Sequence, residues 1–423
     1  MHFFRSTGNV IRPLSLSAFV TLTAAVIGAQ TAPTGAKAKV ALYAAVGPEL
    51  TTYNVDVEAA SLVRQASVTL PQNVQEAWPH PSRRYLYVTW SNNVGGTAGR
   101  HGVTAFRIDP ASGALQPHGR PISLAARSVF MTVDIPGNHL VVAYNEPSGA
   151  TVHRIAVDGT LGAAVPQAGD LDFGVYAHQV RVDPSNQMVI VITRGNGPTA
   201  TKPEDPGALK VFGYKDGVLT NRASIAPGGG YNFQPRHLEF HPTRPFVFIT
   251  LERQNKLQVY RKVNGPALSP APLFTKETLT DPSRLADQAT SAIHVHPNGR
   301  FLYLGNRGSG TVDFQGKRVL GGGENSIAVY SIDQQTGEPA LIQNADTRGV
   351  HPRTFAIDPS GRILVVANMQ QLLVRDKEEV RPLPATLSVF SIGRDGKLTF
   401  VKKYDQDTSG GRNLFWTGMV ALP

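Results

Sequence analysis

The stretch AIHVHPNGRFLYLGNRG at residues 292–308 decides the fold, because it holds one complete unit of a pattern that recurs along the chain. An apolar segment leads into a turn that contains Pro297, and a second segment, FLYL at residues 301–304, follows the turn. Short runs rich in aromatic and apolar residues, bounded by proline and glycine, are typical of β-strands. The stretch therefore predicts two strands joined by a proline turn.

The same arrangement occurs at five other places in the chain. Turns with Pro81, Pro136, Pro184, Pro242 and Pro359 precede similar runs at residues 85–90, 140–144, 188–193, 246–250 and 363–367. Intervals of roughly 48 to 62 residues are typical of propeller blades or other repeat arrays. Each unit continues with a third strand, a glycine turn such as the one at Gly217, and a fourth strand. Four antiparallel strands make one blade.

The number of units predicts the whole fold. Six units carry the proline, and residues 39–70 supply a seventh unit without it. One more strand follows within residues 413–421, and we expect it to pair with the N-terminal blade and close the ring, which removes unpaired strand edges. No helical periodicity of useful length is present. We therefore predict an all-β fold, a seven-bladed β-propeller of four-stranded antiparallel blades, as a single domain over residues 39–423.

The N-terminal residues have the order of a secretory signal. Arg5 and Arg12 precede a largely apolar stretch at residues 14–27, and small residues follow around Ala29. This order predicts a signal peptide over residues 1–29, with approximate cleavage, and a linker over residues 30–38. The alternative is an uncleaved anchor, although the apolar stretch is short for one. We expect an exported protein, periplasmic or secreted, without stable membrane insertion after cleavage.

Composition narrows the possible classes of protein. The chain has 423 residues, of which 41% are hydrophobic and 17% charged, so a large core is expected rather than disorder. It has no cysteine, which excludes disulfides, thiolate zinc sites and a cysteine nucleophile. The net charge is +10, but the basic residues are scattered. We expect attraction for small anions, no nucleic-acid partner, and a monomer.

The topology of a propeller brings particular polar residues to one mouth of the central axis. The starts of first strands and the ends of second strands lie on the same face, near the axis. The residues expected there are His178, Arg236, His237, His294 and Arg353 from first strands and Arg194, Glu252, Arg307 and Asn368 from second strands. Each alone is more often structural, but buried arginines that converge with a glutamate are typical of anion sites. Glu252 opposes an anion, so we expect it to pair with an arginine or to carry a proton, with a raised or coupled titration.

The sequence predicts structural roles for several other histidines and a peripheral position for four long segments. His80, His241 and His296 each precede the proline of a turn, which indicates a role in the blade. His294 and His296 alternate like a metal pair, but no carboxylate has matching spacing, so we expect no metal and no cofactor. The extra sequence at residues 91–101, 196–208, 308–325 and 369–385 falls between second and third strands, and we expect it to form a rim or lid over the mouth.

The repeats resemble the seven-bladed propeller lactonase family, which includes propeller-type 6-phosphogluconolactonases and carboxymuconate cyclases. The phrases that carry the resemblance are PRHLEFHP (235–242), the stretch 292–308, HPRTFAIDPSGRILVVAN (351–368) and SIDQQTGEP (331–339). The resemblance implies a site of His178, Arg236, Glu252 and Arg307. One departure lies at Thr193-Arg194-Gly195, where the family usually has Asp-Leu-Gly at the end of a second strand.

The resemblance implies hydrolysis of a sugar lactone or another small anionic lactone, without a metal or cofactor. Glu252 or His178 would be the general base, and Arg236 and Arg307 would bind the anionic group or the oxyanion. The residues expected to contact the substrate are His237, His294, Arg353, Asn368 and Arg194. Two alternatives remain open: a cycloisomerase that closes a muconate-type diacid to a lactone, and a non-enzymatic exported propeller that binds a ligand or protein through its rim loops.

Overall fold

The structure is a computed structural model that describes residues 1–2, 39–95 and 98–423. Contacts divide the chain into Met1–Lys37 and Ala38–Pro423, and every strand given below lies in the second unit. Apart from residues 1–2, the predicted signal peptide and linker lie outside the described residues. Among the residues that the structure describes, none belongs to a helix long and apolar enough to cross a membrane.

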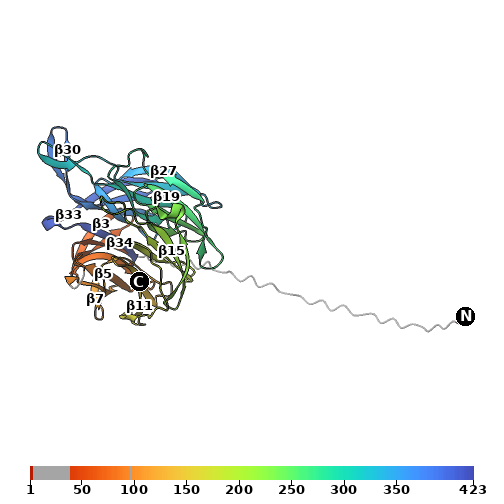
Figure 1. The fold of residues 1–423 in the computed structure, drawn as a ribbon. Helices are drawn as coiled ribbons and strands as arrows, with labels where there is room; N and C mark the ends of the chain where they lie inside the picture. The colour runs from red at the N-terminus through yellow and green to blue at the C-terminus, as the bar shows by residue number, and fades with distance from the viewer. Residues whose placement is uncertain (3–38, 96–97) are drawn as a thin grey trace, which may run out of the picture. The chain divides into compact units, whose positions relative to one another are not determined.

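The prediction of repeated antiparallel blades is confirmed (Figure 1). The first three blades contain, in spatial order, the following strands. Blade 1 has β34 (Leu414–Ala421), β1 (Val40–Val46), β2 (Glu49–Asp56) and β3 (Ser61–Thr69). Blade 2 has β4 (Asn73–Pro79), β5 (Tyr85–Ser91) and β6 (His101–Ile108), with β7 (Leu115–Pro117) and β8 (Ile122–Ser123) both on β6. Blade 3 has β9 (Ser128–Val133), β10 (His139–Asn145), β11 (Ser148–Ile155) and β12 (Leu161–Ala164).

The other four blades have the same order. Blade 4 has β13 (Ala177–Val182), β14 (Met188–Thr193), β15 (Ala208–Lys215) and β16 (Val218–Ile225). Blade 5 has β17 (Pro235–Phe240), β18 (Phe246–Leu251) and β19 (Lys256–Val263), with β20 (Ala267–Leu268) and β21 (Phe274–Glu277) on β19. Blade 6 has β22 (Gln288–Val295), β23 (Phe301–Gly308), β26 (Ser326–Ile332) and β27 (Pro339–Asp346). Blade 7 has β28 (Val350–Ile357), β29 (Ile363–Gln370), β32 (Ala385–Ile392) and β33 (Leu398–Gln406). Two short 3₁₀ turns, η2 (Pro227–Gly230) and η3 (Ser409–Gly411), precede β17 and β34.

The first strands of the seven blades surround the axis. In the order β4, β9, β13, β17, β22, β28 and β34, each contacts the next, and β34 also contacts β4. The C-terminal strand β34 pairs antiparallel with β1, so the two ends of the described domain meet in blade 1. The buried apolar residues form clusters between adjacent blades, such as the one that joins β14 and β15 to β17 and β18. The core is thus a set of layers between neighbouring sheets.

Hydrogen bonds between blades recur at equivalent positions. The Nε2 atoms of His80, His241 and His296 lie 2.9, 2.8 and 2.7 Å from glycine carbonyl oxygens in the proline turn of the following blade. In the same way the hydroxyl of Tyr87 donates to the carbonyl of Gly159 in blade 3 at 2.9 Å. Gly159 has a φ of +85°, and a Cβ there would overlap the ring of Tyr85. The structural role predicted for the three histidines is therefore confirmed.

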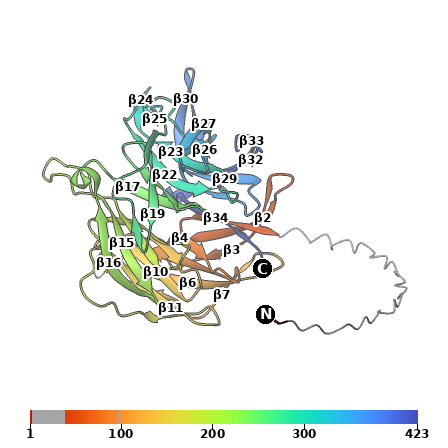
Figure 2. The same ribbon diagram turned by 90° about the vertical axis from the view of Figure 1, so that its right-hand side faces the viewer.

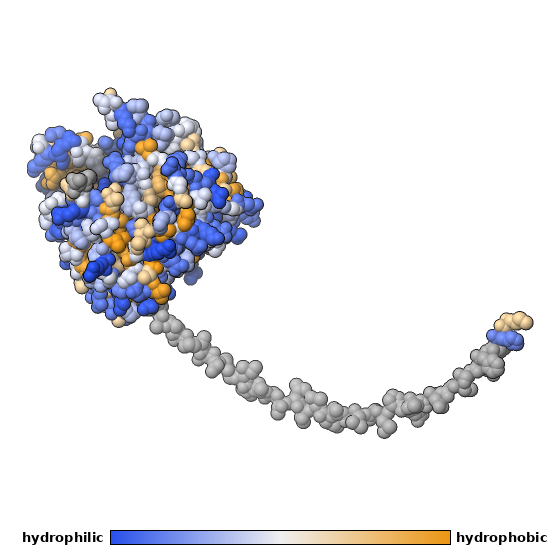
Figure 3. Space-filling model, turned by 60° about the horizontal axis from the view of Figure 1, so that its bottom comes forward, coloured by the Kyte–Doolittle hydropathy of each residue, from blue (hydrophilic) through white to orange (hydrophobic). Residues whose placement is uncertain are grey.

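The extra segments lie between second and third strands, as predicted. Two of them differ from simple loops, because they form a four-stranded sheet, here called the rim sheet, of β24 (Thr311–Phe314), β25 (Lys317–Leu320), β30 (Leu372–Asp376) and β31 (Glu379–Leu383). Its two hairpins come from blades 6 and 7 and join through a parallel pairing of Val319 with Leu373. Figures 1 and 2 show β30 projecting from the body of the propeller. In Figure 3, hydrophobic patches alternate with hydrophilic ones over one face of the domain.

We expect the C-terminal strand to contribute strongly to stability. Leu414 of β34 is fully buried, so Leu414→Ala removes apolar contacts and leaves a cavity, at a cost of about 2–5 kcal/mol in the free energy of unfolding. The control is Val401→Ala on β33, where the side chain is 41% exposed, and we expect a change within about 0.5 kcal/mol. Denaturant unfolding measures both values. Equal values for the two variants would contradict a packed β34.

Candidate active site

A β-bulge recurs near the start of the first strands and directs their polar side chains. In β13 Ala177 pairs with Thr193 and Gln179 with Ile192, so His178 is the extra residue. Arg236 in β17 and Arg353 in β28 are extra residues in the same way. A bulge bends the strand and re-aims side chains next to it, and it is over-represented beside active sites. The same type of β-bulge thus directs three of the predicted site residues toward the axis.

The backbone before each of these bulges is held in the left-handed region. Tyr176, Gln234 and His351 have φ values of +60°, +41° and +61°, and each lies two residues before a bulged residue. Non-glycine residues in this region cost free energy, and such residues cluster at ligand sites. Because the same conformation recurs in three blades, it belongs to the geometry that aims His178, Arg236 and Arg353.

Glu252 lies at the centre of a cluster of arginines. It follows β18 directly, and its main chain is fixed by hydrogen bonds with Gln234 and Thr290, each of 2.9 Å. Its Oε2 accepts from Nη1 of Arg194 at 3.2 Å. Its Oε1 accepts from Nη2 of Arg307 and lies 3.0 Å from Nε of Arg236, although that N–H is not aligned for a hydrogen bond. We call Arg194, Arg236, Glu252 and Arg307 the axial cluster.

The charges of the axial cluster are largely removed from water. The side chains of Arg236, Glu252 and Arg307 are 1%, 9% and 11% exposed. Burial alone would raise the pKa of Glu252, but the charges of Arg236, Arg307 and Arg194 outweigh it and lower that pKa. The predicted pairing with arginine is therefore confirmed. Of the two predicted alternatives, a raised or a coupled titration, the raised one is wrong, because three cations stabilise the carboxylate. Three guanidinium groups against one carboxylate leave an excess of positive charge.

His178 is neutral and lies beside the cluster. Burial, followed by the charge of Arg236 and of three other arginines, lowers its pKa well below the ordinary value. Its Nδ1 is buried and has no hydrogen-bond partner, and its ring centroid is 5.1 Å from that of His237. The pKa of His237 is lowered in the same way, first by burial and then by Arg236. The structure thus brings His178 and His237 to the cluster as uncharged imidazoles.

Two predicted arginines, Arg194 within the cluster and Arg353 beside it, pack against aromatic rings. The guanidinium carbon of Arg194 lies 3.9 Å from the ring centroid of Tyr176, and that of Arg353 lies 3.9 Å from the ring centroid of Phe415. The Nε atoms of Arg353 and Arg307 are buried without a hydrogen-bond partner. The cluster therefore retains N–H donors that no group of the described chain satisfies.

Two predicted residues do not reach the cluster. The strand β22 begins at Gln288, so His294 lies far along it, opposite Tyr303, and its Nδ1 is 3.3 Å from Oε2 of Glu239. Asn368 is fully buried inside blade 7, where its Nδ2 donates to Thr347, Thr386 and Ser388 at 3.0, 3.0 and 3.1 Å. Its amide hydrogens are committed to neighbouring loops and strands, so Asn368 presents no free N–H donor to the cluster.

Sequence reasoning gave no site role to two other polar residues that the structure places here, His351 and Glu76. Nε2 of His351 lies 2.9 Å from Nη1 of Arg307, and burial and the charge of Arg307 lower the pKa of His351 to about 2. Glu76 comes from β4, and burial raises its pKa to about 8 despite the charges of Arg353 and Arg236. The signal for His351 was its place two residues before Arg353. Glu76 lies at the first strand of blade 2, which the prediction of converging residues did not include.

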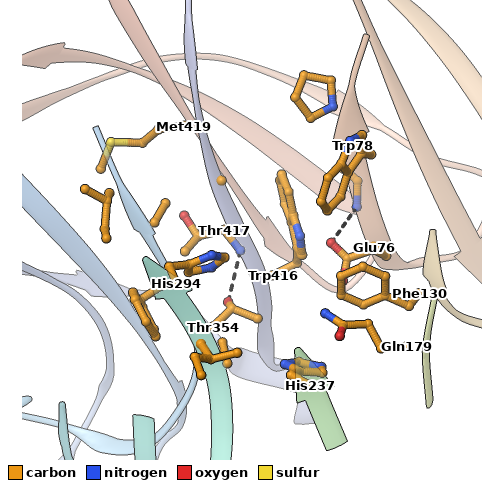
Figure 4. A pocket seen from close by; sticks show the side chains of 18 of the residues that line it. Glu76, Trp78, Phe130, Gln179, His237, His294, Thr354, Trp416, Thr417 and Met419 are labelled. Carbon is orange, nitrogen blue, oxygen red and sulfur yellow. Dashed lines mark hydrogen bonds between the residues drawn. The ribbon is translucent and has the colours of Figure 1, made fainter. Parts of the chain in front are cut away.

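A cavity lies on the axis next to the cluster. It has a volume of about 330 Å³ and is lined by residues from all seven first strands, including Glu76 and His237 (Figure 4). The axis therefore combines a positively charged cluster with an adjoining space of the size that ligand pockets have. Neutral imidazoles, unpaired N–H donors and arginines together can bind an anion, stabilise an oxyanion and accept a proton.

The fold and the site define a propeller with a charged axial site, and comparison with known proteins gives the family. The family model "Lactonase, 7-bladed beta-propeller" matches residues 37–375. The chain is 30% identical to the 6-phosphogluconolactonase of Bacillus subtilis (strain 168) over 309 residues, which are 69% of this chain and 79% of the relative. It is 36% identical to the 6-phosphogluconolactonase of Formosa agariphila over 306 residues, which are 68% of this chain and 76% of the relative. The chain belongs to the seven-bladed β-propeller lactonase family.

A solved structure agrees with this fold. The periplasmic gluconolactonase of Pseudomonas aeruginosa superposes with a TM-score of 0.65 at 20% identity, covering 91% of this chain and 100% of that chain. At this identity the likeness concerns the fold. The family model and the two 6-phosphogluconolactonase relatives confirm the family resemblance noted from the sequence.

Loss of the Glu252 charge is expected to destabilise the axial cluster. Glu252→Gln leaves buried guanidinium groups without their anion, which costs about 3–5 kcal/mol at pH 7. Because the folded pKa of Glu252 is lowered, its contribution is present above the unfolded pKa near 4.5 and is lost as the pH falls through the folded pKa. Unfolding free energies of both proteins against pH measure this difference.

The matched control is Glu49→Gln, which removes a surface partner of Arg64, whose side chain is 63% exposed. We expect its effect to be below about 1 kcal/mol. Added sulfate should restore part of the thermal stability of Glu252→Gln, because it replaces the missing anion. A Glu252→Gln protein as stable as the control at pH 7 would contradict the electrostatic role of Glu252.

Proposed function

We propose that this protein hydrolyses a small sugar lactone at the axial cluster, with a preference for a lactone that carries an anionic group. The observation that carries the proposal is the excess of buried positive charge beside a neutral His178 with a free Nδ1. Membership of the lactonase family and the names of the two relatives support lactone hydrolysis. The three arginines against one carboxylate support an anionic substrate.

His178 is the general base in this proposal. In the tautomer with its proton on Nε2, Nδ1 can accept a proton from a water that attacks the lactone carbonyl carbon. Both oxygens of Glu252 are held by arginines, so its carboxylate is a poorer proton acceptor and instead fixes the guanidinium groups. Sequence left the choice between the two residues open, and the free Nδ1 favours His178.

The arginines stabilise negative charge as it develops. Attack of water gives a tetrahedral intermediate whose oxyanion needs preorganised donors, and Arg307 and Arg353 each retain a buried Nε without a partner. Collapse of the intermediate breaks the ring C–O bond, and the leaving oxygen takes up the proton that His178 accepted. The product is a hydroxy acid, whose carboxylate the same arginines can hold. His237 and Arg194 complete the polar lining.

The proposal also covers the export of the protein, its oligomeric state and the closure of its ring. We propose that residues 1–29 direct export and are removed, and that residues 39–423 act as one monomeric domain whose ring β34 closes. The order of charged, apolar and small residues supports export. The pairing of β34 with β1 and its contacts with β4 and β28 support closure. Cell fractionation tests export, and sizing of the purified protein tests whether it is a monomer.

Kinetics of two variants test the assigned roles. His178→Ala should lower kcat by about a hundredfold or more with little change in KM, because it removes proton transfer. Arg307→Gln should raise KM more for 6-phosphogluconolactone than for gluconolactone, because it removes charge that binds the anion. His118→Gln, after the outer strand β7, is the control and should leave both constants unchanged. A His178→Ala protein with full kcat would exclude His178 as the base.

The pH profile provides an independent test. Because burial and the neighbouring arginines lower the pKa of His178, the imidazole stays unprotonated below pH 6.5 and remains able to accept a proton. We expect kcat/KM to be flat from pH 8 to 6.5, with its acid limb below 6.5, after correction for uncatalysed lactone opening. An acid limb centred above 6.5 would contradict a base in this environment.

The substrate assay separates this proposal from the two alternatives. Purified protein should hydrolyse gluconolactones and have no activity on muconates. Activity on the diacids alone would favour cycloisomerisation, since the same arginines can hold two carboxylates. Deletion of residues 309–324, which carry β24 and β25, should leave lactone turnover measurable in the enzyme. Absence of activity on both classes would leave binding through the rim as the alternative.

A further inference from the structure

The axial cavity extends away from the axial cluster, along the first strands. It begins beside Glu76 and His237 and reaches Pro79 and Pro297, which lie at the proline turns. It shares Trp78, Arg181 and Pro297, among other lining residues, with a hollow of about 570 Å³ formed by those turns. The cavity therefore opens toward the face of the proline turns, whereas the axial cluster lies at the face of the rim sheet.

Aromatic rings form walls of this cavity. Figure 4 shows Trp78, Phe130 and Trp416 around it. The ring centroids of Trp78 and Phe130 are 5.9 Å apart, in an edge-to-face arrangement. The guanidinium carbon of Arg181 lies 4.9 Å from the Trp78 ring, and two hydrogen bonds of 3.1 and 2.7 Å fix that guanidinium to Glu239. The Arg181–Glu239 ion pair thus fixes the guanidinium group that packs against the Trp78 ring.

A few polar groups face the same space. Oε1 of Gln179 accepts a hydrogen bond from the Leu238 amide at 2.5 Å, which orients the side-chain amide of Gln179 beside Glu76 (Figure 4). Oγ1 of Thr354 accepts from the Thr417 amide at 3.1 Å, so its hydroxyl hydrogen can turn to another acceptor. Amide and hydroxyl groups of this kind can exchange hydrogen bonds with ligand hydroxyls.

The polar lining of the cavity has little net charge, unlike the axial cluster. Arg181 is compensated by Glu239, and although burial alone would raise the Glu239 pKa, the charge of Arg181 and the hydrogen bond with His294 lower it to about 2. Burial raises the pKa of Glu76 to about 8, so this carboxyl is mostly protonated at neutral pH. His237 is uncharged for the reason given above. An uncharged ligand therefore suits this space better than an anion.

We propose that the axial cavity is a second binding site, which takes an uncharged polyhydroxylated ring of monosaccharide size from the face of the proline turns. The volume of about 330 Å³ lies within the range of small-molecule pockets. The C–H faces of such a ring pack against Trp78 and Trp416, and its hydroxyls bond to Gln179 and Glu76. The site does not depend on lactone hydrolysis at the axial cluster.

Tryptophan fluorescence tests the site directly. The chain has three tryptophans, two of which, Trp78 and Trp416, line the cavity, whereas the third, Trp90, lies on β5 and donates to Thr104. In a Trp90→Phe background, titration with D-glucose, D-galactose, D-mannose, L-arabinose and myo-inositol should give a saturable change in emission for at least one probe. None of these probes is a lactone, so hydrolysis cannot affect the result.

Filling the cavity with a larger side chain should weaken the fluorescence response to the sugars. Ala356→Leu places extra carbons in the cavity and should weaken binding at least tenfold, whereas Ala223→Leu on the exposed strand β16 should leave it unchanged. If Ala356→Leu does not fold, Trp78→Phe and Trp416→Phe replace it, and each should remove part of the signal. Arg307→Gln should weaken sulfate binding without changing the sugar titration by more than about twofold, which separates this site from the axial cluster.

Two results would overturn the proposal. One is the absence of a saturable change with every probe of the panel. The other is a change that persists unaltered in Ala356→Leu, or in both tryptophan variants, because the ligand would then lie elsewhere. Loss of lactone hydrolysis in His178→Ala together with an intact sugar response would support both proposals, whereas a sugar response in a protein without lactonase activity would reject only the proposed function.

Discussion

The carboxylate of Glu252 is the interaction on which the site depends. It receives guanidinium groups from three consecutive blades: Arg194 from blade 4, Arg236 from blade 5 and Arg307 from blade 6. Buried arginines so close together repel one another, and the desolvated carboxylate offsets that repulsion. One anion cannot neutralise three cations, so the cluster remains suited to a second anion.

The local backbone explains how so many polar side chains reach one axis. A regular strand alternates its side chains between two faces, so successive residues cannot share a direction. The bulges at His178, Arg236 and Arg353 break that alternation, and the left-handed residues before them turn the chain into the strand. Beyond the bulges the strands become regular, and the axis changes from a charged cluster to an aromatic cavity with little net charge.

The sequence-based expectations differ from the structure at three residues, and in each case a contact between distant parts of the chain explains the difference. His294 was expected at the mouth because the start of its strand was placed too late, whereas pairing with β23 extends β22 back to Gln288. Asn368 lies near the end of β29, opposite Pro352, but its amide hydrogens are taken up by carbonyl and hydroxyl groups of blade 7 and the loop before it. Glu76 was overlooked because its carboxyl lies near the arginines only through the arrangement of different blades around the axis.

The sequence by itself determined the repeat, the proline turns, the order of strands, and the convergence of Arg236, Glu252 and Arg307, because strand periodicity and turn chemistry are local properties. The tertiary structure alone decided which groups pair, that Glu252 is ionised, that His178 keeps a free Nδ1, and that two loop hairpins join into the rim sheet. These properties depend on burial and on distances between blades. Such distances are set by packing between the first strands of neighbouring blades, which no single repeat encodes.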